Sequence, residues 1–196
     1  NGAFYSCQKL RKVSFGPQLK SIGSSALCRC EGITELNLPN GLETIESGAF
    51  YGCNNLTEVV MPESVTSIGS EVFAFCSALK KVTLPSSLTD IPDKLFYACD
   101  VLNDIVIPTS VKTMGRGVFS GCKALERMTI GDGVTIGNNL FSDCESLKEV
   151  KLPATLTTIP EYTFNKCVSL KKVEFPTGLM SIERYAFEGS GIEEVV

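Results

Sequence analysis

Two residue types are absent from this chain of 196 residues: it contains neither histidine nor tryptophan. Without histidine, the side chain that most often serves as a general base in catalysis is missing. No apolar run approaches the roughly 18 residues that a membrane-spanning helix needs. The net charge is −4 with mixed signs, so no basic patch indicates nucleic-acid binding. These absences argue against an enzyme, direct membrane insertion and a nucleic-acid partner.

A repeat of 23 residues is what the chain does contain. Cysteines recur with this spacing, and one step of 22 residues, from Cys122 to Cys144, indicates a deletion of one residue near 131–136. Phenylalanine keeps the same period three residues before cysteine. A period of roughly 20–30 residues is typical of a solenoid, in which stacked copies bury one another's apolar side chains. The predicted core ladder is Cys30, Cys53, Cys76, Cys99, Cys122, Cys144, Cys167, Phe50, Phe73, Phe96, Phe119, Phe141 and Phe164.

Each repeat has two halves with different patterns. The first, Leu-x-x-Val-x-Leu-Pro, as in 79–85, alternates apolar residues and predicts a short strand that proline ends. The second, with Ala-Phe-x-x-Cys, as in 49–53, predicts a single helical or 3-10 turn with one side facing inward. We therefore expect one domain over residues 1–196, with about eight repeats that are partial at both ends. It should have a concave parallel sheet and one-turn helical or 3-10 segments on the convex side.

The combined pattern Leu-x-x-Val-x-Ile-Pro-x-x-Val-x-x-Ile-Gly-x-x-Ala-Phe-x-x-Cys resembles the leucine-rich repeat of the BspA type, also called the Treponema pallidum type. The resemblance covers essentially the whole chain and implies a right-handed β/α superhelix of the α/β class. It also implies proteins that are mostly secreted or displayed on the surface of bacteria and some anaerobic protists. There they are linked to adhesion, host-protein binding and aggregation. The motif positions are core positions, so binding residues belong to the variable positions.

The candidate binding surface consists of the third and fifth residues of each strand pattern, which point away from the core. Charges alternate along much of the third-position column, so residues one repeat apart can form ion pairs. Two interpretations stay open: a solvated ladder that keeps the sheet soluble and in register, or a shallow protein-binding surface. No tyrosine or tryptophan falls in either column, so binding should be weak, electrostatic or multivalent. The candidate residues are Lys12, Glu35, Glu58, Val60, Lys81, Thr83, Asp104, Val106, Arg127, Glu149 and Lys172.

The cysteines allow three interpretations: buried free thiols, disulfides or metal ligands. Single thiols 23 residues apart, without Cys-x-x-Cys or histidine, do not suit a metal site. We favour small buried hydrophobes that pack between phenylalanines, and we expect no cofactor. Cys28 lies outside the ladder in a column of mixed polar and aromatic residues, which predicts an accessible surface thiol. Tyr51, Phe75 and Tyr97 lie on the helical side of adjacent repeats, either partly buried or as an exposed aromatic strip for partners.

The function predicted from these patterns is a non-enzymatic protein-binding module of a secreted or cell-surface protein. It would serve in adhesion or host-protein recognition through the concave sheet face. Two alternatives stay open: a structural spacer that displays other domains, and an intracellular adaptor. We expect a monomer whose partner is a protein, and binding that gains strength from repetition. Because the chain begins and ends within repeats, we also expect a fragment of a longer protein, without its targeting signal.

Overall fold

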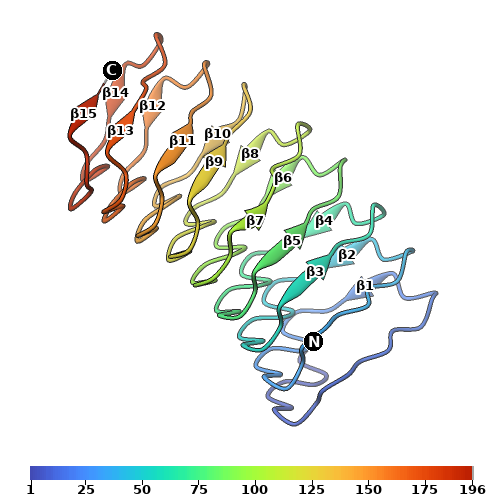
Figure 1. The fold of residues 1–196 in the computed structure, drawn as a ribbon. Helices are drawn as coiled ribbons and strands as arrows, with labels where there is room; N and C mark the ends of the chain where they lie inside the picture. Colours follow the sequence, from blue (N-terminus) through green and yellow to red (C-terminus); the bar gives the residue numbers. More distant parts are fainter. Residues whose placement is uncertain (196) are drawn as a thin grey trace.

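The computed structural model describes residues 1–195 as a stack of coils, each built from one repeat (Figure 1). Successive coils lie side by side from the N-terminus to the C-terminus. Each full coil has three sides: a strand from the Leu-x-x-Val-x-Leu segment, a second and shorter strand, and a series of turns. The molecule is therefore a repeat solenoid in which each coil is stabilised mainly by its neighbours.

The first side, which we call the strand face, is built of parallel strands that pair from coil to coil. Lys81, for example, lies opposite Glu58 of the previous coil and opposite Asp104 of the next coil. Val59 is buried while its two neighbours are exposed, so one surface of the sheet covers the core. The strands are β3 (Glu58–Val60), β5 (Lys81–Thr83), β7 (Asp104–Ile105), β9 (Arg127–Thr129), β11 (Glu149–Lys151), β13 (Lys172–Val173) and β15 (Glu194–Val195).

A second row of parallel strands follows the first in each coil, and the sequence patterns did not predict it. Its members are β1 (Ser21–Ile22), β2 (Thr44–Ile45), β4 (Ser67–Ile68), β6 (Asp90–Ile91), β8 (Thr113–Met114), β10 (Thr135–Ile136), β12 (Thr158–Ile159) and β14 (Ser181–Ile182). The residue after such a strand donates its N–H to the previous coil, as Gly69 N does to Ile45 O at 2.8 Å. Pro92 and Pro160 occupy this position without an N–H, and the row is interrupted there, between β4 and β6 and between β10 and β12.

The third side, which we call the turn face, corrects the prediction of one-turn helical or 3-10 segments, because residues 1–195 contain no helix. Gly48 and Gly52 have φ angles of 64° and 68°, in the left-handed region that a right-handed helix excludes. From Gly48 to Gly52, the backbone N–H groups donate alternately to the next coil and within their own coil. Tyr51 N donates within its coil to Gly48 O at 3.1 Å, whereas Phe50 N donates to Val72 O of the next coil at 3.0 Å. Because alternate N–H groups serve the neighbouring coil, the regular i to i−4 bonds of a helix do not form.

The bonds between coils on the turn face run without interruption through the described chain. Three N–H groups of each coil donate to the next, among them Phe73 N to Leu95 O at 3.1 Å and Phe96 N to Val118 O at 3.0 Å. The strand face, by contrast, is interrupted between β7 and β9 and between β11 and β13. These interruptions and those of the second row fall between different coils. Neighbouring coils are therefore always joined along at least two sides.

The core consists of side-chain ladders that run along the stack. The rings of Phe50 and Phe73 stack with centroids 5.5 Å apart and planes 7° apart, and the stacking continues coil by coil to Phe187. The Cys99 thiol donates to the Phe73 carbonyl of the previous coil at 3.1 Å, and the other ladder cysteines repeat this bond. All cysteines and phenylalanines of the predicted core ladder have 0% exposure. Cysteine therefore supplies a weak donor as well as a small apolar volume.

Candidate binding surfaces

The candidate residues of the strand face are all exposed, because they alternate with the buried residues of each strand. Val60, Thr83 and Val106 lie in the fifth-position column, and Val106 is 79% exposed. The third-position column contains Lys12, Glu35, Glu58, Lys81, Asp104, Arg127, Glu149 and Lys172. The structure thus brings the predicted set together on one face.

Charges of the third-position column pair with one another along the strand face. Lys81 Nζ lies 3.8 Å from Glu58 Oε1 and 3.7 Å from Asp104 Oδ2. Arg127 Nε lies 3.4 Å from Glu149 Oε2, and both side chains are 72% exposed. Exposed pairs of this kind contribute about 0–1 kcal/mol each. The paired charges of the strand face therefore add little to the free energy of unfolding. A partner's charged group can replace one member of a pair with little loss of stability.

The column is not paired throughout. Glu35 and Glu58 are bridged neighbours with the same charge, which is mildly unfavourable in adjacent strands. Lys172 Nζ lies 3.6 Å from Glu194 Oε2, so the alternation holds again at the C-terminal coils. Because Glu58 is already paired with Lys81, a cationic group of a partner would find its least balanced counterpart at Glu35.

Two hollows open on the strand face at the two interruptions of its hydrogen bonding. The hollow between β7 and β9 has a volume of about 330 Å3 and is lined by Val106, Ile107 and Met128 among others. The hollow between β11 and β13 has a volume of about 730 Å3 and apolar lining from Val150 and Phe175. Gly131 and Val134, which also line the smaller hollow, belong to the repeat that lacks one residue. The strand pattern around β11 and β13 shows no such departure.

Arg127 lines both hollows and is the arginine of the candidate column. Lys151 and Glu174 also line the larger hollow, although they are missing from the predicted set. Both residues occupy fifth positions of their strands, so the same alternation could have included them. The larger hollow thus combines charges of both signs with an apolar floor.

The aromatic residues of the turn face fit both interpretations that the sequence left open. Phe75 is 42% exposed, whereas Tyr51 and Tyr97 are half-buried. The ring of Phe75 lies 5.2 Å from that of Tyr51 and 5.2 Å from that of Tyr97, measured between centroids. The three rings therefore form one continuous patch across three coils, exposed mainly at its centre.

The predicted surface thiol at Cys28 is wrong, because this residue is only 7% exposed. Its burial raises the pKa of the thiol, against a smaller opposite effect of Arg29. Cys7 is the exposed cysteine instead. Burial also raises the pKa of Cys53 and of Cys167 to about 12, so both thiols stay protonated at neutral pH. The mixed column misled the prediction because its polar members are buried as well: Ser120, Ser142 and Asn165 are 8%, 5% and 6% exposed.

All nine cysteines of the described chain are free thiols. Within residues 1–195, no group of three or more histidine, cysteine, aspartate or glutamate side chains is placed to hold a metal ion. The same residues include no helix whose length and apolar character would let it cross a membrane.

Comparisons with known proteins agree with this architecture. The family model described as "BspA type Leucine rich repeat region" matches six copies over residues 1–103 and 89–196. A comparison with curated proteins finds no match.

Several solved structures are similar to the chain. The T. pallidum leucine-rich repeat protein is 31% identical with a TM-score of 0.69, over 80% of this chain and 73% of that one. A leucine-rich cell surface protein from Faecalibacterium prausnitzii is 26% identical with a TM-score of 0.67, over 98% of this chain and 55% of that one. The pneumococcal vaccine antigen PcpA shares the fold, with a TM-score of 0.69. It is 23% identical over 95% of this chain and 50% of that one. The chain thus spans about half the length of the F. prausnitzii protein.

Proposed function

Because the chain belongs to the BspA-type leucine-rich repeat family, we propose that it is the protein-binding part of a secreted or cell-surface protein and binds its partner through the strand face. The similarity to a cell surface protein of F. prausnitzii supports this location. The role we propose for the surface is adhesion or recognition of a host protein, with no enzymatic step.

The placement of Arg127 between the two hollows is the observation that carries this proposal. Arginine is among the residues that contribute most to protein interfaces, and it does so beside pockets that exclude water. Its side chain is exposed, and within residues 1–195 its ion-pair partner is the equally exposed Glu149. A carboxylate of a partner can therefore replace Glu149 while an apolar side chain of the partner enters either hollow.

Binding of this kind should be modest for each contact and should gain from repetition. The pairs on the strand face are exposed, so exchanging one for a partner's charge gains about 0–1 kcal/mol. Several such contacts along a rigid stack act together because the first contact raises the effective concentration for the others. We therefore expect avidity toward extended or multivalent partners and a marked dependence on ionic strength.

Reversing charge on the strand face tests the proposal. Lys81→Glu combined with Arg127→Glu should reduce binding to immobilised extracellular-matrix and serum proteins, measured by surface plasmon resonance with the chain displayed on beads. The matched control combines Lys123→Glu with Lys166→Glu, two exposed, ion-paired lysines outside the strand columns with the same total change of charge. Equal binding by both double variants to every protein of the panel would refute recognition through the strand face.

One observation favours a second candidate function, that of a spacer. The hydrogen bonds of the turn face join every coil to the next without interruption, which suits a stiff element that displays other modules. A chain that binds no protein of the panel but keeps its length and rigidity in small-angle scattering would favour this alternative.

A further inference from the structure

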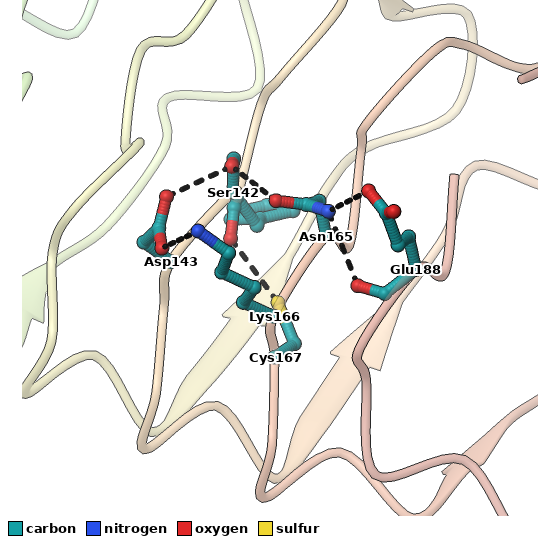
Figure 2. A network of polar contacts seen from close by, with 7 residues as sticks. Ser142, Asp143, Asn165, Lys166, Cys167 and Glu188 are labelled. Atoms are coloured by element: carbon teal, nitrogen blue, oxygen red, sulfur yellow. Dashed lines mark hydrogen bonds and ion pairs between the residues drawn. The ribbon is translucent and has the colours of Figure 1, made fainter. Parts of the chain in front are cut away.

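The C-terminal part of the turn face carries polar side chains that satisfy one another (Figure 2). The Ser142 hydroxyl lies 3.1 Å from Asp143 Oδ2 and 3.3 Å from Asn165 Oδ1. Asn165 Nδ2 donates to Glu188 Oε2 at 3.0 Å, and Lys166 Nζ lies 3.5 Å from Asp143 Oδ1. These residues occupy the two positions before the cysteine of each repeat or their equivalent. In this part of the chain, the turn face is closed by its own hydrogen bonds.

The same two positions are filled differently in the N-terminal half, by Arg29, Tyr51, Phe75 and Tyr97. Phe75 has a φ angle of 60°, a conformation in which a bulky side chain is rare and strained. It is also 42% exposed, so neither local preference nor burial explains its choice. All five tyrosines of the chain lie on the turn face, and none lies in the strand columns. The equivalent residues Arg29 and Ala98 have similar φ angles, so it is the exposed apolar ring of Phe75, and not the backbone conformation, that indicates a functional surface.

A hollow of about 410 Å3 lies beside this aromatic patch. It is flanked by the aromatic side chains of Tyr5 and Tyr51, and its polar lining comes from Ser25, Ser47, Ser70, Arg29 and Glu71. Within residues 1–195, the three serine hydroxyls and the Arg29 guanidinium make no hydrogen bond to another protein group, in contrast with the network of Figure 2. Glu71 is paired with Lys94 at 3.3 Å. The hollow therefore presents several uncommitted donors and acceptors next to aromatic rings.

The surrounding backbone holds these groups in place. Gly52 has a φ angle of 68°, and a Cβ atom there would lie 3.4 Å from Cγ of Arg29, so the Arg29 stem lies directly over the glycine. The pKa of Tyr51 is raised by burial, raised further by Glu71 and lowered by Arg29. Arg29 and Glu71 line the same hollow as Tyr51, so it carries one charge of each sign.

We propose that this hollow binds one neutral pyranose residue of a glycan. The apolar C–H face of the sugar would cover the Tyr51 ring, while its hydroxyls accept from Arg29 and donate to Glu71 and the serines. A lining with one positive and one negative charge suits a neutral ligand whose hydroxyls both donate and accept hydrogen bonds. The volume is at the small end of the roughly 300–1,000 Å3 of ligand pockets.

The arrangement of the rings limits the ligand to a short segment. The ring of Phe75 is tilted by 50° against Tyr51 and by 64° against Tyr97. The three rings therefore form no flat platform on which several sugar residues, or an extended peptide, could lie. This site is on the turn face and is independent of the protein-binding function proposed for the strand face.

The test uses the chain of 196 residues and the methyl glycosides of glucose, galactose, mannose and N-acetylglucosamine, followed by saturation-transfer and amide-shift NMR. At least one glycoside should bind saturably in the millimolar range, with shifts at Gly48, Tyr51 and Ser70. Sorbitol, which has hydroxyls but no rigid apolar face, should not bind.

Two variants and two matched controls locate the site. Tyr51→Ala should weaken binding about tenfold, the value expected for losing one aromatic contact. Arg29→Gln, which changes an exposed side chain, should weaken it several-fold. Tyr162→Ala and Arg116→Gln remove a turn-face tyrosine and an exposed turn-face arginine that do not line the hollow, and they should bind like the unchanged chain.

Three outcomes would overturn the proposal: no saturable binding of any glycoside at tens of millimolar, equal binding of sorbitol, or unchanged affinity in both Tyr51→Ala and Arg29→Gln. Shifts at the same amides with a peptide library but with no sugar would assign the hollow to a peptide ligand instead, which also contradicts it. None of these outcomes depends on the strand face, so the two proposals stand or fall separately.

Discussion

Replacing Gly52 by alanine distinguishes a turn from a helix on the face where the sequence suggested a helix. In a helix, Gly→Ala stabilises by about 0.8–1.0 kcal/mol. In the structure, Gly52 has a φ angle of 68°, and a residue with a Cβ atom loses about 1–2 kcal/mol in this conformation. The alanine also lowers the conformational entropy of the unfolded chain, which stabilises the folded state by about 0.4–1 kcal/mol. The two architectures therefore predict changes of opposite sign, a loss of about 1 kcal/mol for the turn and a gain of about 1 kcal/mol for the helix.

Gly131→Ala is the matched control for this measurement. Gly131 lacks a positive φ angle, and an added Cβ atom would find no heavy atom within 4 Å. Its replacement should stabilise the chain by about 0.4–1 kcal/mol through the unfolded state alone. At Gly52 the added Cβ meets only ordinary contacts, the nearest at 3.4 Å, so backbone conformation is the main difference between the two sites.

Urea unfolding followed by circular dichroism measures both variants, with the slope checked so that a change in midpoint reports stability. For a chain of this size, a loss of about 1 kcal/mol lowers the melting temperature by about 2–4 °C. If Gly52→Ala is as stable as Gly131→Ala, the alternating turns described here do not account for the turn face.

Three further predictions follow from burial and charge. Phe96→Ala should lower the free energy of unfolding by about 3–5 kcal/mol, because its ring is fully buried between two others. Lys81→Gln should change it by less than about 1 kcal/mol, because its two ion pairs are half exposed. Similar losses in both variants would contradict the assignment of core and surface. In native buffer, a thiol reagent should modify Cys7 quickly and the buried cysteines, including Cys28, only after unfolding, where all nine should react; fast labelling of Cys28 would contradict its burial. Raising the pH above about 9 should destabilise the chain progressively. Folding raises the pKa of Cys53 and Cys167 from 9.0 to about 12, so the folded thiols keep their protons while the unfolded thiols ionise. Cys53→Ala should make the loss of stability with pH less steep, and a stability that rises between about pH 9 and about pH 11 would contradict this reasoning.

The parts of the fold that sequence alone predicts are those that repeat. Phe73 and Cys76 recur in phase with their equivalents, and only a stacked core explains such columns, so their burial follows from the period. The outward direction of Lys81 follows from the alternation of the strand, and the family resemblance agrees with the family model that matches the chain. The non-enzymatic function, the fragment boundaries and the single domain stay predictions.

What the sequence did not predict depends on bonds between coils. The Ala-Phe-x-x-Cys spacing suits one helical turn, but the N–H of Phe50 has a better-placed acceptor in Val72 O of the next coil. The second row of strands is only two residues long in each coil, which is too short for a periodic pattern. Pro92 lacks the N–H that would join β6 to β4, and the strand pattern alone does not indicate this interruption.

The offset between interruptions has a mechanical consequence for the stack as a whole. If the chain is pulled along the stack, no boundary between coils offers a plane where both rows of strands are open at once. Each boundary resists separation through the backbone bonds of the turn face together with at least one row of strands. A rupture would therefore begin by peeling one side of a coil and not by parting the stack cleanly. Such a chain would yield gradually under tension, coil by coil, and would refold against the coils that remain.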